Sequence, residues 1–104
     1  MKLRLLCVGK LTAKFLRQGA EEFAGRAGRY LPLEVVELKE EKGGGKKPDP
    51  AFIRDREGER ILSRIPPDAY VVALDEKGTG LTSEGLAAEL EKHMVQGTSE
   101  VVFV

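Results

Sequence analysis

The chain has one cysteine, one histidine and no tryptophan among its 104 residues, and it has no long hydrophobic run. One cysteine permits no internal disulfide, which fits a reducing compartment. No stretch approaches the roughly 20 apolar residues that a transmembrane helix needs. The short apolar run at the start is interrupted by Arg4 and Lys10, so it does not resemble a secretory signal. We therefore predict a cytoplasmic protein that does not enter a membrane.

Residue sets typical of metal or nucleophilic sites are also missing from the sequence. His93 follows Glu89 by four residues on the polar side of an expected helix, so we predict a solvated side chain and no metal site. Cys7 lies inside an apolar run with no base in view, which favours an inert core thiol. The Gly-Gly-Gly-Lys-Lys segment lacks the spacing of a phosphate-binding P-loop.

The formal net charge of zero hides an uneven distribution. Residues 1–65 hold 15 basic and 10 acidic residues, whereas residues 66–104 hold 2 basic and 7 acidic ones. A basic half either solvates helix surfaces or faces a polyanion. Composition alone leaves both interpretations open.

Apolar periodicity predicts strands that alternate with helices. We expect strands at residues 1–8, 33–38, 70–74 and 99–104, and helices at residues 13–30, 51–64 and 84–95. Ser83 is expected to cap the third helix and Gly97 to end it. This alternation predicts a single α/β domain over residues 1–104, with a mostly parallel sheet sandwiched by helices.

The patterns within these elements also predict burial. Partial alternation over residues 33–38 indicates a half-exposed or edge strand, whereas the apolar runs at 70–74 and 101–104 favour strands buried on both faces. Apolar stripes at helical spacing are expected to face the core. They comprise Leu16, Ala20, Phe23, Ala27 and Tyr30, then Ile53, Ile61, Leu62 and Ile65, then Leu86, Ala87, Leu90 and Met94.

The turn Leu74–Gly80 reads L-D-E-K-G-T-G and follows the third expected strand. The carboxyl ends of parallel strands are where α/β folds bind ligands. Gly78 and Gly80 would let a ligand approach the backbone. Asp75 and Glu76 are acid–base candidates, although we expect both to be exposed and without a perturbing partner. A ligand-contacting turn and a plain strand–helix connection remain equally consistent with these residues.

Several segments, in order and with matching spacing, resemble one known family. They are M-K-L-R-L-L-C-V-G-K-L, E-G-E-R-I-L, V-V-A-L-D-E-K-G, S-E-G-L-A-x-x-L and G-T-S-E-V-V-F-V. The combination is similar to the bacterial 23S ribosomal RNA pseudouridine-N3 methyltransferase H family, a member of the α/β-knot (SPOUT) methyltransferases. The resemblance covers all 104 residues and corresponds to the N-terminal two-thirds of that family.

The resemblance implies a cytoplasmic homodimer that uses S-adenosyl-L-methionine. It implies methyl transfer to N3 of a pseudouridine in large-subunit ribosomal RNA of the assembled ribosome. Leu74 matches one residue that contacts the cofactor. The family's other cofactor contacts follow the strand matched by residues 101–104. The chain is therefore expected to stop before the knot, to bind the cofactor weakly and to be inactive alone. The sequence assigns no catalytic residue.

The basic half supplies the expected RNA contacts. We predict that Lys42, Lys46 and Lys47 contact phosphates, which positions RNA without reading its sequence. The arginines on the outer face of the second helix are further candidates, namely Arg54, Arg56, Arg60 and Arg64. If 104 residues is the natural length, the alternative is a non-catalytic RNA- or ribosome-binding module. A flavodoxin-like binder is disfavoured because no Ser/Thr/Gly-rich phosphate loop follows the first strand.

Overall fold

The computed structural model describes residues 1–43, 45, 47 and 49–104, and in these residues strands and helices alternate as predicted. The strands are β1 (Lys2–Val8), β2 (Leu33–Leu38), β3 (Tyr70–Val72) and β4 (Glu100–Phe103). The helices are α1 (Lys14–Ala27), α2 (Pro50–Leu62) and α3 (Ser83–Val95). In the described residues no helix combines the length and the apolar character needed to cross a membrane.

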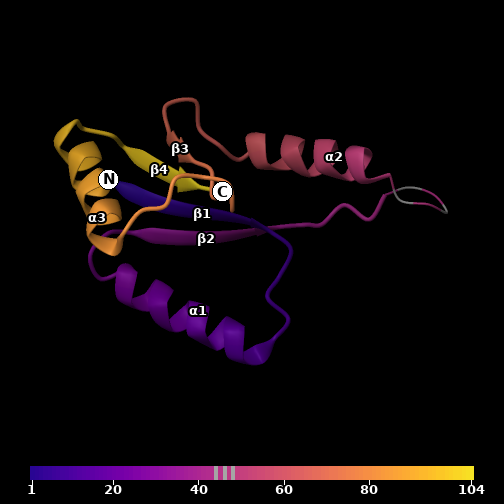
Figure 1. The fold of residues 1–104 in the computed structure, drawn as a ribbon, viewed down its shortest axis with the longest axis horizontal. Helices are drawn as coiled ribbons and strands as arrows, with labels where there is room; N and C mark the ends of the chain where they lie inside the picture. Colours follow the sequence, from indigo (N-terminus) through magenta and orange to yellow (C-terminus); the bar gives the residue numbers. More distant parts are fainter. Residues whose placement is uncertain (44, 46, 48) are drawn as a thin grey trace.

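The strands form one parallel sheet in the order β2-β1-β4-β3. In the central strands, Leu5 of β1 lies opposite Val35 of β2 and Phe103 of β4. The strands run from left to right in Figure 1, with α1 below them, α2 to the upper right and α3 near their amino ends. This arrangement confirms the predicted α/β class and puts every carboxyl strand end at one edge.

The sheet positions confirm two of the three burial predictions for strands. β4 lies inside the sheet, and its Val101 and Val102 are 1% and 0% exposed. β2 lies at an edge, as its alternation predicted. The prediction that β3 is buried is wrong, because β3 forms the other edge and its Tyr70 and Val71 are exposed. An apolar run indicates a strand, but the strand's place depends on how the chain crosses over.

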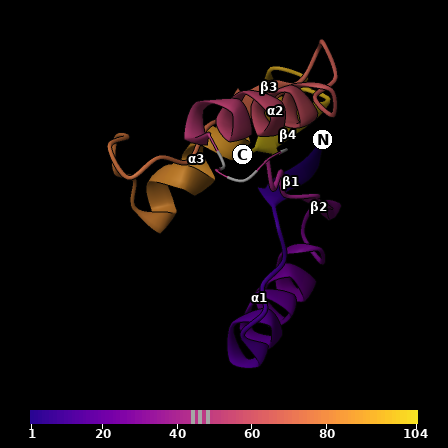
Figure 2. The ribbon, with the colours of Figure 1, turned by 90° about the vertical axis from the view of Figure 1, so that its right-hand side faces the viewer.

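The helices stand away from the sheet. Neither α1 nor α2 contains a buried residue, and Figure 2 shows α1 extending well below the strands. The radius of gyration is 15.6 Å, compared with about 13 Å for a compact domain of 100 residues. Among the described residues, the pairs of elements in extended contact are strand pairs, so the helices leave much of their apolar stripes uncovered.

The predicted stripes are therefore wrong for most of their members, which remain exposed. These are Leu16, Ala20, Phe23, Tyr30, Leu62, Leu86, Ala87 and Met94. Tyr30 also lies beyond the end of α1. The remaining members are half-buried, between the exposed residues and a true core. They are Ala27, Ile53, Ile61, Ile65 and Leu90.

The buried residue of α3 is His93, so the prediction of a solvated His93 is wrong. Its ring centroid lies 4.0 Å from that of Tyr70, and its Nδ1 lies 3.1 Å from Thr98 Oγ1. Gly97, at a φ of 80°, ends the helix as predicted and turns the chain back toward His93. The Thr98 amide then donates to the His93 carbonyl at 3.0 Å.

The start of α3 differs by one residue from the prediction. Thr82, rather than Ser83, is the N-cap, and its Oγ1 accepts a hydrogen bond from the Gly85 amide at 2.9 Å. Glu84 lies in the first turn, where a negative charge interacts favourably with the helix dipole. The cap therefore begins the helix inside the connection that follows the L-D-E-K-G-T-G turn.

A buried ion pair joins the strands near their amino ends. Arg4 Nη2 of β1 lies 3.2 Å from Glu100 Oε1 of β4, and the Glu100 side chain is only 5% exposed. Arg4 Nη1 also donates to the Arg64 carbonyl at 3.0 Å, and Arg4 Nε lies 3.6 Å from Glu34 of β2. Arg4 thus links three strands to the segment that leads into the fourth.

Candidate functional site

Two clefts open at the carboxyl edge of the sheet. The β1/β2 cleft, lined by Gly9, Lys10, Thr12, Glu37–Glu40 and Lys42, has a volume of about 560 Å³. The β3/β4 cleft, lined by residues 72–75, 78–79, 81–83, 86 and 103, has a volume of about 450 Å³. Both volumes fall within the range of small-molecule sites.

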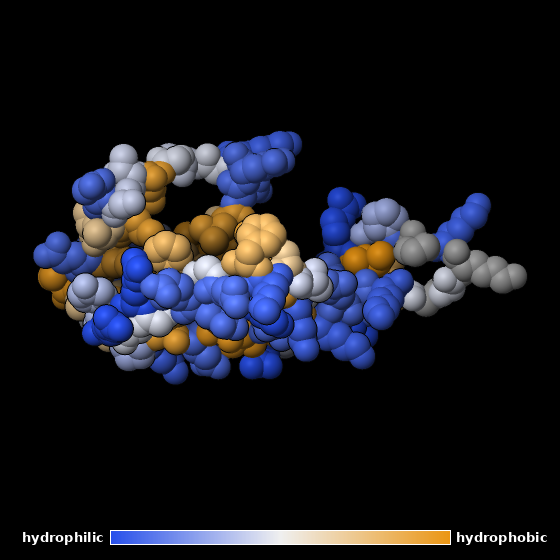
Figure 3. Space-filling model, turned by 90° about the horizontal axis from the view of Figure 1, so that it is seen from below, coloured by the Kyte–Doolittle hydropathy of each residue, from blue (hydrophilic) through white to orange (hydrophobic). Residues whose placement is uncertain are grey.

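The β3/β4 cleft is lined by apolar side chains and exposed backbone. Leu74, Leu81 and Leu86 line it and are exposed. The Leu74 amide donates to the Val104 carbonyl at 2.8 Å, and the Val104 amide donates to the Val72 carbonyl at 3.0 Å. Pairing between the two chain segments therefore continues past the strands and fixes Leu74 at the cleft. Figure 3 shows hydrophobic residues in a hollow of the molecule, with hydrophilic residues around it.

The turn beside this cleft is built by Asp75. Asp75 Oδ1 accepts from the Lys77 amide at 2.9 Å, and the Asp75 carbonyl accepts from the Gly78 amide at 2.9 Å. Asp75 and Glu76 are both exposed, as predicted. The Asp75 carboxylate shapes the turn, which is the role expected of an Asp at this position.

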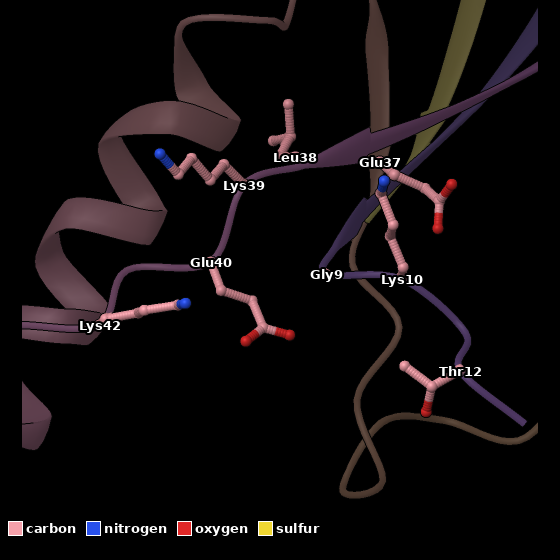
Figure 4. Close-up of a pocket in the computed structure, with 8 residues that line it drawn as sticks. All are labelled: Gly9, Lys10, Thr12, Glu37, Leu38, Lys39, Glu40 and Lys42. Atoms are coloured by element: carbon pink, nitrogen blue, oxygen red, sulfur yellow. The ribbon is translucent and has the colours of Figure 1, made fainter.

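The β1/β2 cleft forms where two neighbouring strands separate. The Gly9 amide still donates to the Leu38 carbonyl at 2.8 Å. Gly9 then adopts a φ of 85°, which side-chain-bearing residues rarely adopt, and the chain turns away toward α1. In Figure 4 the Lys42 side chain points toward Glu40, whereas Lys39 points toward α2.

The wall formed by residues 39–42 is anchored on α2. Arg60 Nη1 donates to the Lys39 carbonyl at 2.9 Å, and Arg60 Nη2 pairs with the Glu41 carboxylate. The Glu41 amide donates to Glu57 Oε2 at 3.1 Å. The prediction of an outward Arg60 is therefore wrong, since its charge is used within the fold. Arg54 and Arg64 are exposed as predicted.

Cys7 lies half-buried in β1, two residues before Gly9 of the β1/β2 cleft. Burial and the nearby Glu37 charge raise the pKa of its thiol above the ordinary value. This direction of the shift favours the protonated thiol, as the prediction of an inert cysteine implies. The prediction that Cys7 lies in the core is wrong, because the residue is only half-buried.

Comparison with known sequences decides the family. The profile of a family described as "Predicted SPOUT methyltransferase" matches residues 1–104. The chain belongs to this SPOUT methyltransferase family. The resemblance noted from the sequence motifs is thereby confirmed.

Curated SPOUT relatives match the chain over nearly all of its length. "Ribosomal RNA large subunit methyltransferase H" of Syntrophotalea carbinolica is 52% identical over 104 residues, all of this chain and 65% of the relative. The protein of the same name from Citrifermentans bemidjiense is 48% identical over 103 residues, 99% of this chain and 64% of the relative. The chain thus spans about 65% of the length of these relatives.

The structure shows where the residues predicted from the SPOUT resemblance lie. Leu74, the expected cofactor contact, lies in the β3/β4 cleft. Lys42 lines the β1/β2 cleft, and Lys47 is exposed in the segment before α2. Lys46 lies outside the described residues. Sequence reasoning missed Lys10 and Glu40 as cleft residues, although the Gly-Lys pair directly after the first strand was an available signal.

Proposed function

We propose that this protein is part of an S-adenosyl-L-methionine-dependent methyltransferase that acts on N3 of a pseudouridine in 23S ribosomal RNA. The names of the relatives support the RNA substrate and the methyl-transfer reaction. The position of Leu74 is the structural observation that carries the proposal, because its backbone is held at an apolar cleft on the carboxyl edge. That edge is where α/β folds bind ligands.

The β3/β4 cleft fits part of the cofactor. Leu74, Leu81 and Leu86 in its lining suit contact with the flat face of a ring. The cofactor, when bound, supplies a methyl group on a positively charged sulfur. The role proposed for residues 72–86 is to orient that molecule, since methyl transfer depends mainly on holding the reacting atoms in line. The remaining cofactor contacts are proposed to come from residues outside 1–104.

Lys42, Lys46 and Lys47 are proposed to contact RNA phosphates. Lys42 and Lys47 are exposed. No ion pair to either of them occurs among the described residues. Ammonium groups in this state can exchange their counterions for phosphates.

We also propose that the protein acts as a homodimer on assembled ribosomes in the cytoplasm. Large apolar side chains with more than 60% exposure occur on all three helices and on the turn, among them Phe15, Phe23, Leu62 and Val95. Exposed apolar surface of this kind marks interaction sites. Sedimentation of the purified protein would show whether it pairs, and a monomer at all concentrations would contradict the homodimer.

The deciding experiment is a methyl-transfer assay on ribosomes that lack the modification. The product of the natural reading frame containing these residues is incubated with cofactor, and the digested RNA is analysed by mass spectrometry. A methyl group on pseudouridine N3 is the expected result. Ribosome binding without methyl transfer would instead support the non-catalytic RNA-binding module.

Calorimetry tests the proposal that residues 1–104 supply only part of the cofactor site. Residues 1–104 alone are expected to bind S-adenosyl-L-methionine weakly or not at all, and tight stoichiometric binding would contradict the proposal. In the complete protein, Leu74→Ala should weaken cofactor binding about tenfold, which corresponds to loss of roughly one apolar side-chain contact. Leu62→Ala is the matched control, because Leu62 is similarly exposed but does not line the cleft.

A further inference from the structure

The β1/β2 cleft has a floor that depends on glycine. An added Cβ at Gly9 would overlap the Glu40 carboxylate, so this carboxylate lies directly against the backbone of Gly9. Figure 4 shows Glu40 and Lys42 on one side of the cleft, and Lys10 and Thr12 on the other. Polar groups of opposite charge thus border one cavity at the end of two adjacent parallel strands.

Two lysines of this cleft, Lys10 and Lys42, are available to a ligand. Both are exposed, and in the part of the chain that the structure describes neither forms an ion pair. The Lys39 side chain points toward α2 instead (Figure 4). The wall that carries Lys42 is held by the hydrogen bonds of residues 39–41 to α2. A wall fixed before binding reduces the entropy lost when a ligand is held.

We infer that the β1/β2 cleft binds a ribose–phosphate unit of single-stranded RNA. Lys10 and Lys42 supply ammonium groups for the phosphate, and the Glu40 carboxylate and Thr12 hydroxyl supply partners for the ribose hydroxyls. The lining includes no aromatic ring on which a base could stack. The cleft therefore recognises the backbone, and Glu40 favours RNA over DNA through the 2′-hydroxyl.

This inference rests on the proposed RNA substrate. Beyond the lysines at 42, 46 and 47, it adds Lys10, Thr12 and Glu40 as RNA contacts. Lys10 lies in the connection between β1 and α1, far in sequence from residues 42–47. The substrate RNA would then contact both connections at this edge. The binding of RNA here needs no chemistry at the cofactor cleft, so the two can be tested separately.

The test is an NMR titration of the isotopically labelled chain with a single-stranded RNA tetranucleotide. A DNA tetranucleotide of the same base order and uridine 5′-monophosphate are the comparison ligands. The amide signals of Gly9, Lys10 and Thr12 should shift with the RNA and with the mononucleotide, which carries one ribose–phosphate unit, and RNA should bind several-fold more tightly than DNA. Absence of these shifts with RNA would overturn the assignment, and equal binding of DNA would overturn the role of Glu40.

Paired substitutions make the test quantitative. The double variant Lys10→Ala/Lys42→Ala should bind the RNA about tenfold more weakly. The slope of log K against log salt concentration should become shallower by about 1.4, because two phosphate contacts are lost. Lys77→Ala/Lys92→Ala is the matched control, because it removes the same charge at two exposed positions outside the cleft. Identical affinities of the two double variants would overturn the inference.

The outcomes separate this inference from the proposed function. If the complete protein methylates ribosomes but RNA does not shift the cleft signals, the cleft assignment fails and the methyltransferase stands. If RNA binds the cleft and no methyl transfer is detected, the methyltransferase fails and the cleft assignment stands.

Discussion

The carboxylate of Glu40 lies against the Cα of Gly9, although the two residues belong to connections that follow different strands. Gly9 has a φ of 85°, in the left-handed region. The backbone conformation therefore favours glycine at this position. The overlap with Glu40 adds little, because the exposed Glu40 side chain can turn away.

The Gly9→Ala variant should lower the free energy of unfolding by at least about 1–2 kcal/mol, the usual penalty for an alanine in the left-handed conformation. Urea denaturation provides the measurement. In a Glu40→Ala background the loss should be about the same, because the exposed Glu40 side chain can turn away and the backbone strain accounts for the effect.

Gly58→Ala is the control for this substitution. Gly58 lies inside α2, where an added Cβ meets nothing within 4 Å. Alanine there should raise the free energy of unfolding by about 0.5–1 kcal/mol, owing to its better helix propensity. A Gly9→Ala protein as stable as wild type would show that the turn after β1 does not have the conformation described.

Arg4 and Glu100 give a second prediction about stability. Arg4→Ala would leave the Glu100 carboxylate buried without its cation, and such losses commonly lower the free energy of unfolding by about 3–5 kcal/mol. Replacement of both residues, as in Arg4→Met/Glu100→Leu, should be much less harmful, because no unpaired charge remains. Chemical denaturation of the three proteins measures both effects.

An exposed ion pair provides the contrast. Arg26 and Glu22 of α1 pair at 2.8 Å, and both side chains are about 60% exposed. Loss of this ion pair in Arg26→Ala should therefore change the free energy of unfolding by no more than about 0.5 kcal/mol. If Arg4→Ala and Arg26→Ala had equal effects, the pair between β1 and β4 would not be a buried link.

Local pattern predicted the elements better than it predicted their surroundings. The strands at residues 33–38 and 100–103 and the stop at Gly97 follow from short-range chemistry, and all were correct. The place of β3 at an edge depends on crossovers between distant segments, which no local pattern contains. The exposure of Phe23 and Leu62 depends on whether another element packs against their helices, which periodicity does not reveal.

The candidate site was predictable in the same limited way. Leu74 was proposed because the L-D-E-x-G turn resembles one in the SPOUT family, and Lys42 because it lies in a charged segment. Lys10 was not found, because its importance comes from Glu40 and Lys42, which lie 30 or more positions away in the sequence. Only the parallel pairing of β1 with β2 brings these residues to one cleft.

The thiol of Cys7 should react slowly with thiol reagents at neutral pH. Burial, with the charge of Glu37 as the second cause, raises its pKa in the folded protein. The midpoint of the pH–rate profile should therefore lie at a higher pH than that of a free cysteine, for which the pKa is about 8.5. Glu37→Gln should move this profile to lower pH, and an unchanged profile would remove Glu37 as a cause.

The same pKa shift fixes the sign of a stability effect. A thiol with a raised pKa in the folded state holds its proton longer there than in the unfolded state. Its contribution to stability is complete below the unfolded pKa and is lost as pH rises through the folded pKa. Comparison with Cys7→Ala across alkaline pH isolates this contribution, because the variant cannot titrate at position 7.

The hydrogen bond between His93 and Thr98 should be important for the end of α3. Thr98→Val keeps the shape of the side chain but removes the partner of His93 Nδ1, which lies in a ring that is only 9% exposed. An unsatisfied buried polar atom lowers stability by about 1–3 kcal/mol. Thr79→Val is the control, because Thr79 is exposed, and it should stay within about 0.5 kcal/mol of wild type. Equal effects of the two substitutions in thermal denaturation would mean that the contact with Tyr70 alone holds His93 in place.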